Sequence, residues 1–475
     1  MSWNTASTMG ILYWLYWIVV IVIMVRIMLR NRDTVKTLAW IMVFIFMPFL
    51  GLVLYFFFGR DTRKKRMAGK RMLSQIKQRC TIEVASGMKS EILPEYQSLA
   101  TFFENTSTAS LLPADEVEVI SDTSLFSERL FEILSAAEDH IHLQFYIFEN
   151  DCFGRKLRDL LVEKAKQGVE VRLIYDSVGS WNVGLDFFEE MRCAGVYVES
   201  FLKVIFPLLS NRFNYRNHRK LVIVDGKVGM VGGCNIADRY LNGVKGGVWR
   251  DTMLLLRGMA VNGLQASFLI DWYFTSRTLL SGKRYFPITE GCRNALVQVV
   301  TSNPAGDVRA IVSGYIKVLM LAKGYVYLQT PYFMPDESFM LALKNAAMSG
   351  VDVRLMIPEN SDSVIADYAA MSYLGALLDA GVKVYLYRAG MLHCKTVVCD
   401  DYLSSVGSTN LDSRSFYYNF EISAFVYDRA VALDVKETFL NDLKQCRQLT
   451  ANEYHQRPFF KRCAESFIKL FSPLL

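Results

Sequence analysis

Asn217 to Asn235 reads NHRKLVIVDGKVGMVGGCN, and a related stretch from Leu392 to Asn410 reads LHCKTVVCDDYLSSVGSTN. Each holds a histidine, one residue, a lysine, four residues and an aspartate, then continues through a glycine to an asparagine at the same interval. The shared residues are His218, Lys220, Asp225 and Asn235 in the first copy, and His393, Lys395, Asp400 and Asn410 in the second. Chance does not readily produce two such matches. We therefore expect a duplicated chain whose two copies form one site.

The runs LVIVD and TVVCD after the lysines are rich in β-branched residues, which predicts a buried strand in each copy. Side chains alternate along a strand, so His218 and Lys220 would share one face, as would His393 and Lys395. An imidazole beside an ammonium suits a phosphate diester, because one can attack phosphorus while the other neutralises its oxygens. The alternative, two unrelated core histidines, does not account for two complete copies.

The other shared residues have different expected parts in this site. Asn235 and Asn410 can add neutral hydrogen-bond donors to the phosphate oxygens. Asp225 and Asp400 complete the motifs, but they fall out of phase with the histidines along a strand. We expect these aspartates to brace local backbone rather than to touch substrate.

At these residues the chain resembles the phospholipase D superfamily, whose mark is a pair of HxKxxxxD motifs, and within it the bacterial cardiolipin synthases. NYRNHRK before the first motif, TPYFMPDE at Thr330, GSTNLDSRSF at Gly407 and NFE at Asn419 carry the resemblance. The apolar N-terminus extends it to nearly the whole chain. One departure is Gly233, which stands where the second copy has Ser408.

The resemblance implies a phosphatidyltransferase that needs no cofactor and no metal. It would move a phosphatidyl group from one phosphatidylglycerol to another through a phosphohistidine, giving cardiolipin and glycerol. In the family, carboxylates at places like Asp251 and Glu421 back the histidines, which would fix the imidazole tautomer. These two acids could instead be structural. Neither the residue that acts as nucleophile nor the oligomeric state follows from the motifs.

Three other functions compete with this interpretation. A hydrolase releasing phosphatidic acid, or a transferase to another alcohol, would carry the same motifs. A nuclease is disfavoured, because no basic groove interleaved with aromatic residues stands out, so no nucleic-acid partner is expected. A non-catalytic membrane scaffold is disfavoured because both motifs are intact.

Strands and helices alternate in the same order in two halves, which predicts an α/β fold of two duplicated phospholipase D-like sandwiches related by a pseudo-two-fold axis. HIHLQFYIF (His140 to Phe148) is echoed by YVYLQTPYF (Tyr325 to Phe333), and VEVRLIY by VDVRLMI. We place a membrane hairpin at 1–60, a basic connector at 61–100, the first half at 101–290 and the second at 291–475.

Thr37 to Phe58 is an uncharged run of about 22 residues, long enough to cross the ~30 Å hydrocarbon core. Gly10 to Val25 is a second apolar run, which Ile27 to Leu29 extend beyond Arg26, so the two runs predict a two-helix transmembrane hairpin. A cleaved signal peptide is the alternative, but the chain lacks a basic n-region. Lysines and arginines cluster directly after the second run, which predicts a cytoplasmic catalytic body. We therefore expect a multi-pass protein of the bacterial inner membrane with phosphatidylglycerol and cardiolipin as its lipid partners.

Composition agrees with a membrane-embedded protein. The chain has 475 residues, a hydrophobic fraction of 52% and a net charge of +6, which favours an anionic membrane surface as much as nucleic acid. Its nine cysteines form no CxxC pair and predict reduced thiols. His140 and His142 share a strand face, but no third ligand is evident, so a metal site there is disfavoured.

Two apolar segments have two interpretations each. Leu202 to Leu209 is core or an apolar lip dipping into the bilayer beside the site. The C-terminal segment PFFKRCAESFIKLFSPLL has helical spacing, with basic residues opposite an apolar face. It is an interfacial helix on anionic lipid or a helix packed on the body. The residues of its apolar face are Phe459, Phe460, Cys463, Phe467, Leu470 and Phe471.

Overall fold

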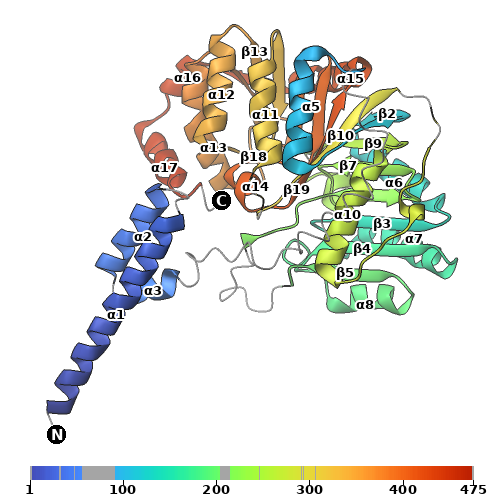
Figure 1. The fold of residues 1–475 in the computed structure, drawn as a ribbon. Helices are drawn as coiled ribbons and strands as arrows, with labels where there is room; N and C mark the ends of the chain where they lie inside the picture. The colour runs from blue at the N-terminus through green and yellow to red at the C-terminus, as the bar shows by residue number, and fades with distance from the viewer. Residues whose placement is uncertain are drawn as a thin grey trace. The chain divides into compact units, whose positions relative to one another are not determined.

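The computed structural model describes residues 3–30, 34–47, 49–55 and 91–472, except 204–213, 245–246, 290, 292–293, 305 and 307. The described residues form an N-terminal group of helices and a larger α/β body (Figure 1). The basic connector lies outside them up to residue 90, as do the basic cluster used for orientation and most of the apolar segment at 202–209.

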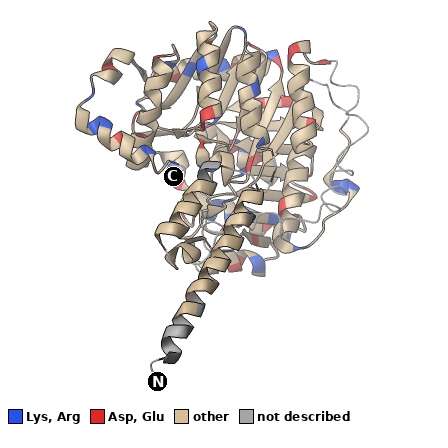
Figure 2. Ribbon diagram, turned by 60° about the vertical axis from the view of Figure 1, so that its left-hand side comes forward, with Lys and Arg blue, Asp and Glu red and all other residues tan. Residues whose placement is uncertain are grey.

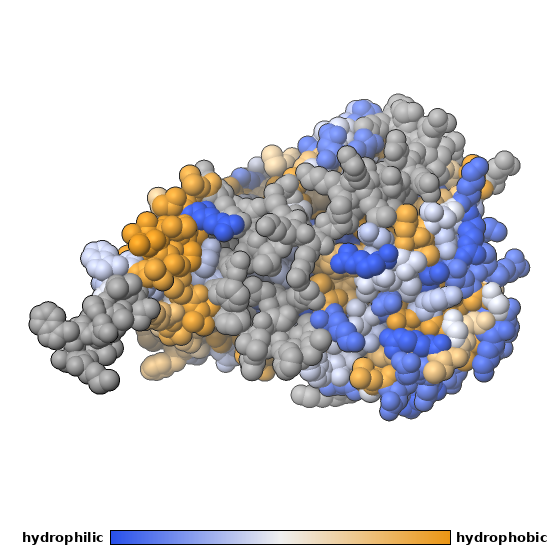
Figure 3. Space-filling view, turned by 60° about the horizontal axis from the view of Figure 1, so that its bottom comes forward, coloured by the Kyte–Doolittle hydropathy of each residue, from blue (hydrophilic) through white to orange (hydrophobic). Residues whose placement is uncertain are grey.

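The N-terminal unit consists of α1 (Trp3–Arg30), α2 (Thr34–Phe46) and the short α3 (Leu50–Leu54). Its small core contains Tyr16, Val20 and Phe44, which are buried between the helices. Charged residues are sparse on these helices and spread over the body (Figure 2), and hydrophobic residues gather on them (Figure 3).

Within the part of the chain that the structure describes, no helix has the length and apolar character needed to cross a bilayer. The transmembrane hairpin predicted for residues 1–60 is therefore not supported. The apolar run from Thr37 to Phe58 is not one helix, because α2 ends at Phe46 and Phe49 has a φ of 65° before α3 begins. At 1.5 Å per residue α2 rises about 20 Å, which is less than the ~30 Å of a hydrocarbon core.

The body contains two mixed sheets with the same internal order. The seven-stranded sheet runs β2-β9-β7-β6-β3-β4-β5, and the nine-stranded sheet runs β1-β10-β19-β17-β16-β11-β13-β14-β20. Seven strands correspond one to one, and in each sheet three are parallel and the rest pair antiparallel. The predicted α/β fold with two duplicated halves is confirmed. The seven pairs are β2 (Glu116–Ile120) with β10 (Ala295–Ser302), β9 (Met253–Arg257) with β19 (Glu421–Tyr427), β7 (Val228–Gly232) with β17 (Leu403–Gly407), β6 (Leu221–Val224) with β16 (Thr396–Cys399), β3 (His140–Phe145) with β11 (Tyr325–Gln329), β4 (Glu170–Asp176) with β13 (Asp352–Pro358), and β5 (Tyr197–Phe201) with β14 (Lys383–Tyr387).

The remaining strands lie at sheet edges or form short pairs. β1 (Leu111–Ala114) and β20 (Cys446–Leu449) are the two edge strands of the nine-stranded sheet. β1 pairs with β10, so residues 111–114 belong to the second sheet although they precede the first. The short pairs are β8 (Val248–Arg250) with β15 (Gly390–Leu392) and β12 (Phe333–Met334) with β18 (Leu411–Asp412).

Strand alternation decides which helices cover each face. On β3, Ile141 and Leu143 enter the core cluster under α6, α7 and α8, while the histidines and Gln144 face α10. On β11, Val326 and Leu328 enter the core under α5, α11, α12 and α13, while Tyr327 stacks on Phe439 of α15. Each sheet is thus sandwiched, and α10 corresponds to α15.

The helices begin where the sequence supplies caps. The side chains of Asp122, Asp151, Asp336, Ser363 and Asp428 each accept a backbone N–H at the first turn of a helix. The helices of the body are α5 (Pro94–Ser107), α6 (Thr123–Ser135), α7 (Cys152–Lys166), α8 (Leu185–Cys193), α9 (Asp238–Asn242), α10 (Val261–Ser276), α11 (Ala310–Leu321), α12 (Glu337–Met348), α13 (Val364–Leu378), α14 (Ser413–Tyr417), α15 (Arg429–Leu443), α16 (Ala451–His455) and α17 (Phe459–Lys469), with a 3₁₀ turn η7 (Lys283–Tyr285).

Candidate active site

Each histidine of the two motifs is held by backbone of the opposite half. The N–H of His218 donates to the carbonyl of Phe420 at 2.9 Å, and the N–H of His393 donates to the carbonyl of Arg250 at 2.7 Å. The parallel pair β8–β15 ends at Arg250 and Leu392, immediately before the second histidine. The motifs therefore lie where the two halves join, and each depends on the other half for its position.

The two candidate carboxylates contact the histidines in a crossed arrangement. His218 Nδ1 lies 3.0 Å from Glu421 Oε1, and His393 Nδ1 lies 2.5 Å from Asp251 Oδ2. A carboxylate only accepts, so each Nδ1 carries the proton and each Nε2 keeps its lone pair. The sequence named both acids but did not say that each would serve the histidine of the other half.

Burial determines the charge state of the imidazoles. It lowers the pKa of His218 to about 4, against the opposing effect of Glu421, and Lys220 lowers it further. It also lowers the pKa of His393 to about 4, again with help from the lysine of its own motif. Burial alone would raise the pKa of Glu421, but the nearby imidazole and Lys220 hold it below its usual value. Both imidazoles are therefore neutral at pH 7.

The motif lysines are buried beside the imidazoles. Lys220 Nζ donates to the carbonyl of His218 at 2.7 Å, and Lys395 makes the same contact with His393. Burial lowers the pKa of both ammonium groups, while Glu421 and Asp251 counteract it. Each lysine also lowers the pKa of the histidine in the other motif. All four side chains thus share one electrostatic environment.

Asp225 and Asp400 lie at the other end of β6 and β16. Asp225 accepts the N–H groups of Glu138, Asp139 and His140 at 2.8–3.0 Å, which fastens the start of β3. Asp400 does the same for the three residues at the start of β11, at 2.7–2.8 Å. Both have positive φ, 53° and 51°. Their hydrogen bonds are with backbone, and none of these is with His218 or His393.

The two motif asparagines differ in their contacts. Asn235 accepts the N–H of Ile147 at 3.0 Å and donates to the hydroxyl of Tyr240 at 2.5 Å, so most of its amide already has protein partners. Asn410 is also buried, and its Oδ1 has no hydrogen-bond partner among the described residues. Asn235 therefore has two protein partners, whereas Asn410 keeps an acceptor oxygen without a partner among the described residues.

Aromatic rings beside the histidines were missed by sequence reasoning. The ring of Tyr146 lies 5.1 Å from that of His218, and Lys220 Nζ lies 5.4 Å from the same ring. Trp249 and Tyr240 lie 5.2 Å and 5.8 Å from His393. Tyr146 directly follows β3 and Trp249 is two residues before Asp251, so their proximity to the motif strands was the available signal.

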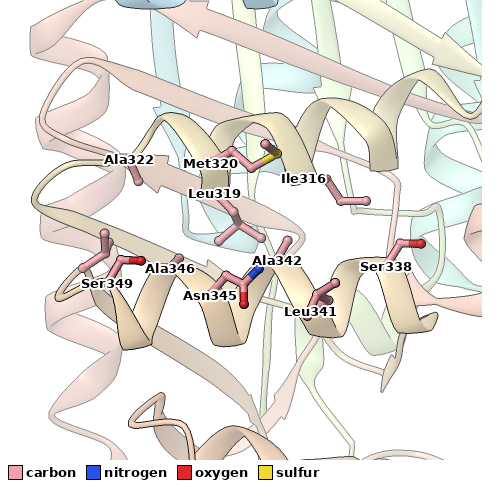
Figure 4. Close-up of a pocket in the computed structure, with 11 residues that line it drawn as sticks. Ile316, Leu319, Met320, Ala322, Ser338, Leu341, Ala342, Asn345, Ala346 and Ser349 are labelled. Atoms are coloured by element: carbon pink, nitrogen blue, oxygen red, sulfur yellow. The ribbon is translucent and has the colours of Figure 1, made fainter.

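Two other features lie apart from this site. The rings of His140 and His142 are 4.7 Å apart and both histidines contact Gln265, and the described residues hold no group of three metal-binding side chains. A shallow apolar groove between α11 and α12 contains none of the predicted site residues (Figure 4). Met320 and Leu341 line its opposite sides.

Comparisons with known proteins agree with this arrangement. The family described as "Cardiolipin synthase, PLD-like domain" matches residues 130–246 and 315–443, and "Phospholipase D-nuclease N-terminal" matches 14–60. The chain is 42% identical to the major cardiolipin synthase ClsA of Bacillus subtilis, over 94% of this chain and 95% of that one. It is 39% identical to a cardiolipin synthase of Clostridium perfringens, over 94% and 96%.

A solved structure shares the fold. The phosphatidylserine synthase of Haemophilus influenzae superposes with a TM-score of 0.63 at 13% identity, covering 80% of this chain and all of that one. With matched family profiles over both halves and relatives over nearly its whole length, the chain belongs to the cardiolipin synthase family of the phospholipase D superfamily.

Proposed function

We propose that the protein joins two phosphatidylglycerol molecules into cardiolipin and releases glycerol. The observation that carries this proposal is the pair of neutral imidazoles, each oriented through Nδ1 by a carboxylate of the other half. The cardiolipin synthases that match 94% of the chain support cardiolipin as the product.

The first step forms a phosphatidyl-histidine. His218 Nε2, neutral because burial lowers its pKa, attacks the phosphorus of the first phosphatidylglycerol. The bond between phosphorus and the glycerol oxygen breaks, and that oxygen takes a proton from His393 Nε2. The bound phosphodiester anion raises the pKa of His393, so this imidazole holds a proton while substrate is present.

The second step returns the enzyme to its starting state. The terminal hydroxyl of a second phosphatidylglycerol gives its proton to His393 and attacks the same phosphorus. A new oxygen–phosphorus bond forms, the nitrogen–phosphorus bond to His218 breaks, and cardiolipin leaves. General acid–base catalysis of this kind contributes about 10²–10⁴-fold.

The other site residues would hold the phosphoryl group. Lys220 and Lys395 each use one donor on a backbone carbonyl, and an ammonium carries three. Their charge stabilises the equatorial oxygens of the pentacoordinate transition state, with Asn410 and Asn235 adding neutral donors. Asp225 and Asp400 contribute by fixing the strands.

The proposed lipid substrates imply a bacterial membrane, and we infer that the body lies on its cytoplasmic side. The described cysteines are all free, which suits that reducing compartment. Water would compete with the acceptor hydroxyl, so the aromatic rings beside His393 favour a lipid alcohol by limiting water at the phosphoenzyme. No nucleic-acid substrate and no cofactor are needed.

The test is a lipid analysis. Purified protein is incubated with phosphatidylglycerol in detergent, with and without added serine or ethanolamine, and the products are identified by mass spectrometry. Cardiolipin and glycerol in equal amounts are expected. Phosphatidic acid as the main product would make the protein a hydrolase, and a phosphatidyl ester of the added alcohol would make it a transferase of another specificity.

A further inference from the structure

Helix α17 is attached to the body through its polar side. Glu465, at the centre of that side, is only 2% exposed and pairs with Arg457 at 2.8 Å. Ser472, just beyond the helix, hydrogen-bonds the hydroxyl of Tyr373 on α13 at 2.8 Å. Ile468 packs against the small cluster at the start of α13. These contacts hold the helix in one orientation.

The apolar side of α17 faces away from the body. A helix on a soluble domain normally buries this side against its neighbours. Here the exposed fraction of Phe460 is 85% and that of Phe467 is 63%. A contiguous apolar face of this kind marks an interaction surface. Its large exposed residues are Phe459, Phe460, Phe467, Leu470 and Phe471.

The charges around this face are positive. Lys461, Arg462 and Lys469 are exposed on α17, whereas its one acid, Glu465, is buried and paired. Lysines and arginines beside an exposed aromatic face are complementary to the negatively charged headgroups of anionic lipids. A protein partner with an acidic rim would have similar charge but offers no reason for the outward aromatic face to be so broad.

The helix is connected to the active site through β12. Met334 of β12 lies in the cluster on which Ile468 packs, and β12 pairs with β18, which begins immediately after Asn410. Leu411 of β18 also donates its N–H to Thr330 at 3.1 Å. Helix α17 is therefore linked through β12 and β18 to the part of the second half that contains Asn410. A bilayer contacting α17 would lie beside the edge at which a lipid phosphate must arrive.

We propose that α17 lies in the headgroup region of an anionic bilayer with its aromatic face among the acyl chains. The choice of a bilayer as occupant rests on the proposed lipid transferase function, while insertion itself can be measured without turnover. Such helices lie in the plane of the interface and bury their apolar face about 5–10 Å deep.

Two exposed native cysteines provide matched probe positions. Cys463 lies in the aromatic face of α17, and Cys193 lies at the end of α8. Two full-length variants keep one of these as the only cysteine, with every other cysteine replaced by alanine. Each is labelled with an environment-sensitive fluorophore and reconstituted into vesicles of phosphatidylglycerol and phosphatidylcholine. Quenching is then measured with a nitroxide on the lipid acyl chain and with aqueous iodide.

The lipid quencher is expected to reduce emission at Cys463 at least about twofold more than at Cys193, with iodide showing the reverse order. Equal quenching at both positions would overturn the proposal. Protection of Cys463 from both quenchers would also overturn it, because the face would then cover a protein surface such as a second copy. These readouts stand even if no cardiolipin is formed.

Turnover in two variants provides a second measurement. Phe460→Ser/Phe467→Ser/Phe471→Ser is compared with Met320→Ser/Leu341→Ser/Met348→Ser, which removes three equally exposed apolar residues from α11 and α12. The α17 variant should lose about tenfold in phosphatidyl transfer on vesicles and keep its rate in detergent micelles. The Met320/Leu341/Met348 variant should keep its rate both on vesicles and in micelles. Equal loss in both variants, or loss in micelles as well, would contradict membrane insertion of α17.

Discussion

The two halves of the body share a strand order but hold their histidine-supporting carboxylates differently. In the second half Ser408 donates its hydroxyl to Glu421, which also accepts from Asn419 at 3.1 Å. In the first half Gly233 occupies the equivalent position, and a Cβ there would lie 2.0 Å from Asp251 Oδ1. The longer side chain of Glu421 is thus paired with the hydroxyl of Ser408, whereas the shorter side chain of Asp251 packs against Gly233, which has no side chain. The halves preserve the position of a carboxylate oxygen rather than the residues that supply it.

The helices that cover the two sheets, α10 and α15, each supply an aspartate that binds an arginine near the site. Asp271 on α10 accepts from Gln144 and from Arg219, which lies inside the first motif. Its counterpart Asp442 on α15 accepts from Gln329 and from Arg250, which precedes Asp251. In both cases a buried arginine is neutralised by an aspartate of the covering helix.

The largest expected effect separates the two histidines by role. His218→Ala removes the nucleophile and should reduce phosphatidyl transfer more than about 10⁴-fold with any substrate. His393→Ala should be equally slow with phosphatidylglycerol but should recover with a phosphatidyl p-nitrophenyl ester, whose leaving group needs no proton. Release of p-nitrophenol measured in both variants checks this. Recovery in His218→Ala instead would reverse the roles.

An exchange of the residues beside the carboxylates tests the comparison directly. Gly233→Ser places a side chain where the carboxylate of Asp251 lies, and it should reduce kcat about 10²–10³-fold and destabilise the fold by about 1–3 kcal/mol. Ser408→Gly removes one hydrogen bond to Glu421 and should reduce kcat only about tenfold. The readouts are kcat and the denaturant midpoint of each variant. Equal losses would show that the halves do not differ in the way described.

Acid should destabilise the body through the same buried pairs. Burial lowers the pKa of His218 and His393 to about 4, so between that value and the ordinary 6.5 the unfolded chain binds more protons than the folded one. Stability is therefore full above about pH 6.5 and falls as pH drops toward 4. The depressed pKa values of Glu421 and Asp251 act in the same direction. Urea unfolding at several pH values checks this, and His218→Gln should reduce the slope.

The smallest effect is expected at the motif aspartates. Asp225→Asn and Asp400→Asn keep the side-chain shape and tolerate a positive φ, but each weakens hydrogen bonds to three backbone N–H groups. Each should cost about 1–2 kcal/mol of stability and change kcat less than threefold. A loss of kcat as large as that of the histidine variants would show that these aspartates take part in catalysis.

Much of this body follows from local pattern. The sequence predicted the repeated order of strands, the motif residues and the two acids. Each of these depends on a pattern of side chains that are close in sequence. The crossed contacts were not predicted, since the distance between Glu421 and His218 is set by how two sheets meet. The rings of Tyr146 and Trp249 were missed for the same reason. The transmembrane hairpin was predicted from hydropathy alone, which does not register the break in helical backbone at Phe49.

Each motif histidine takes its supporting carboxylate and its backbone hydrogen-bond acceptor from the opposite half. One half alone could therefore not orient its histidine for catalysis. A polypeptide with one motif alone would lack both partners, so the site is complete only where two halves meet. The pairing of glutamate with serine on one side and of aspartate with glycine on the other shows that the two halves meet the same requirement with different residues.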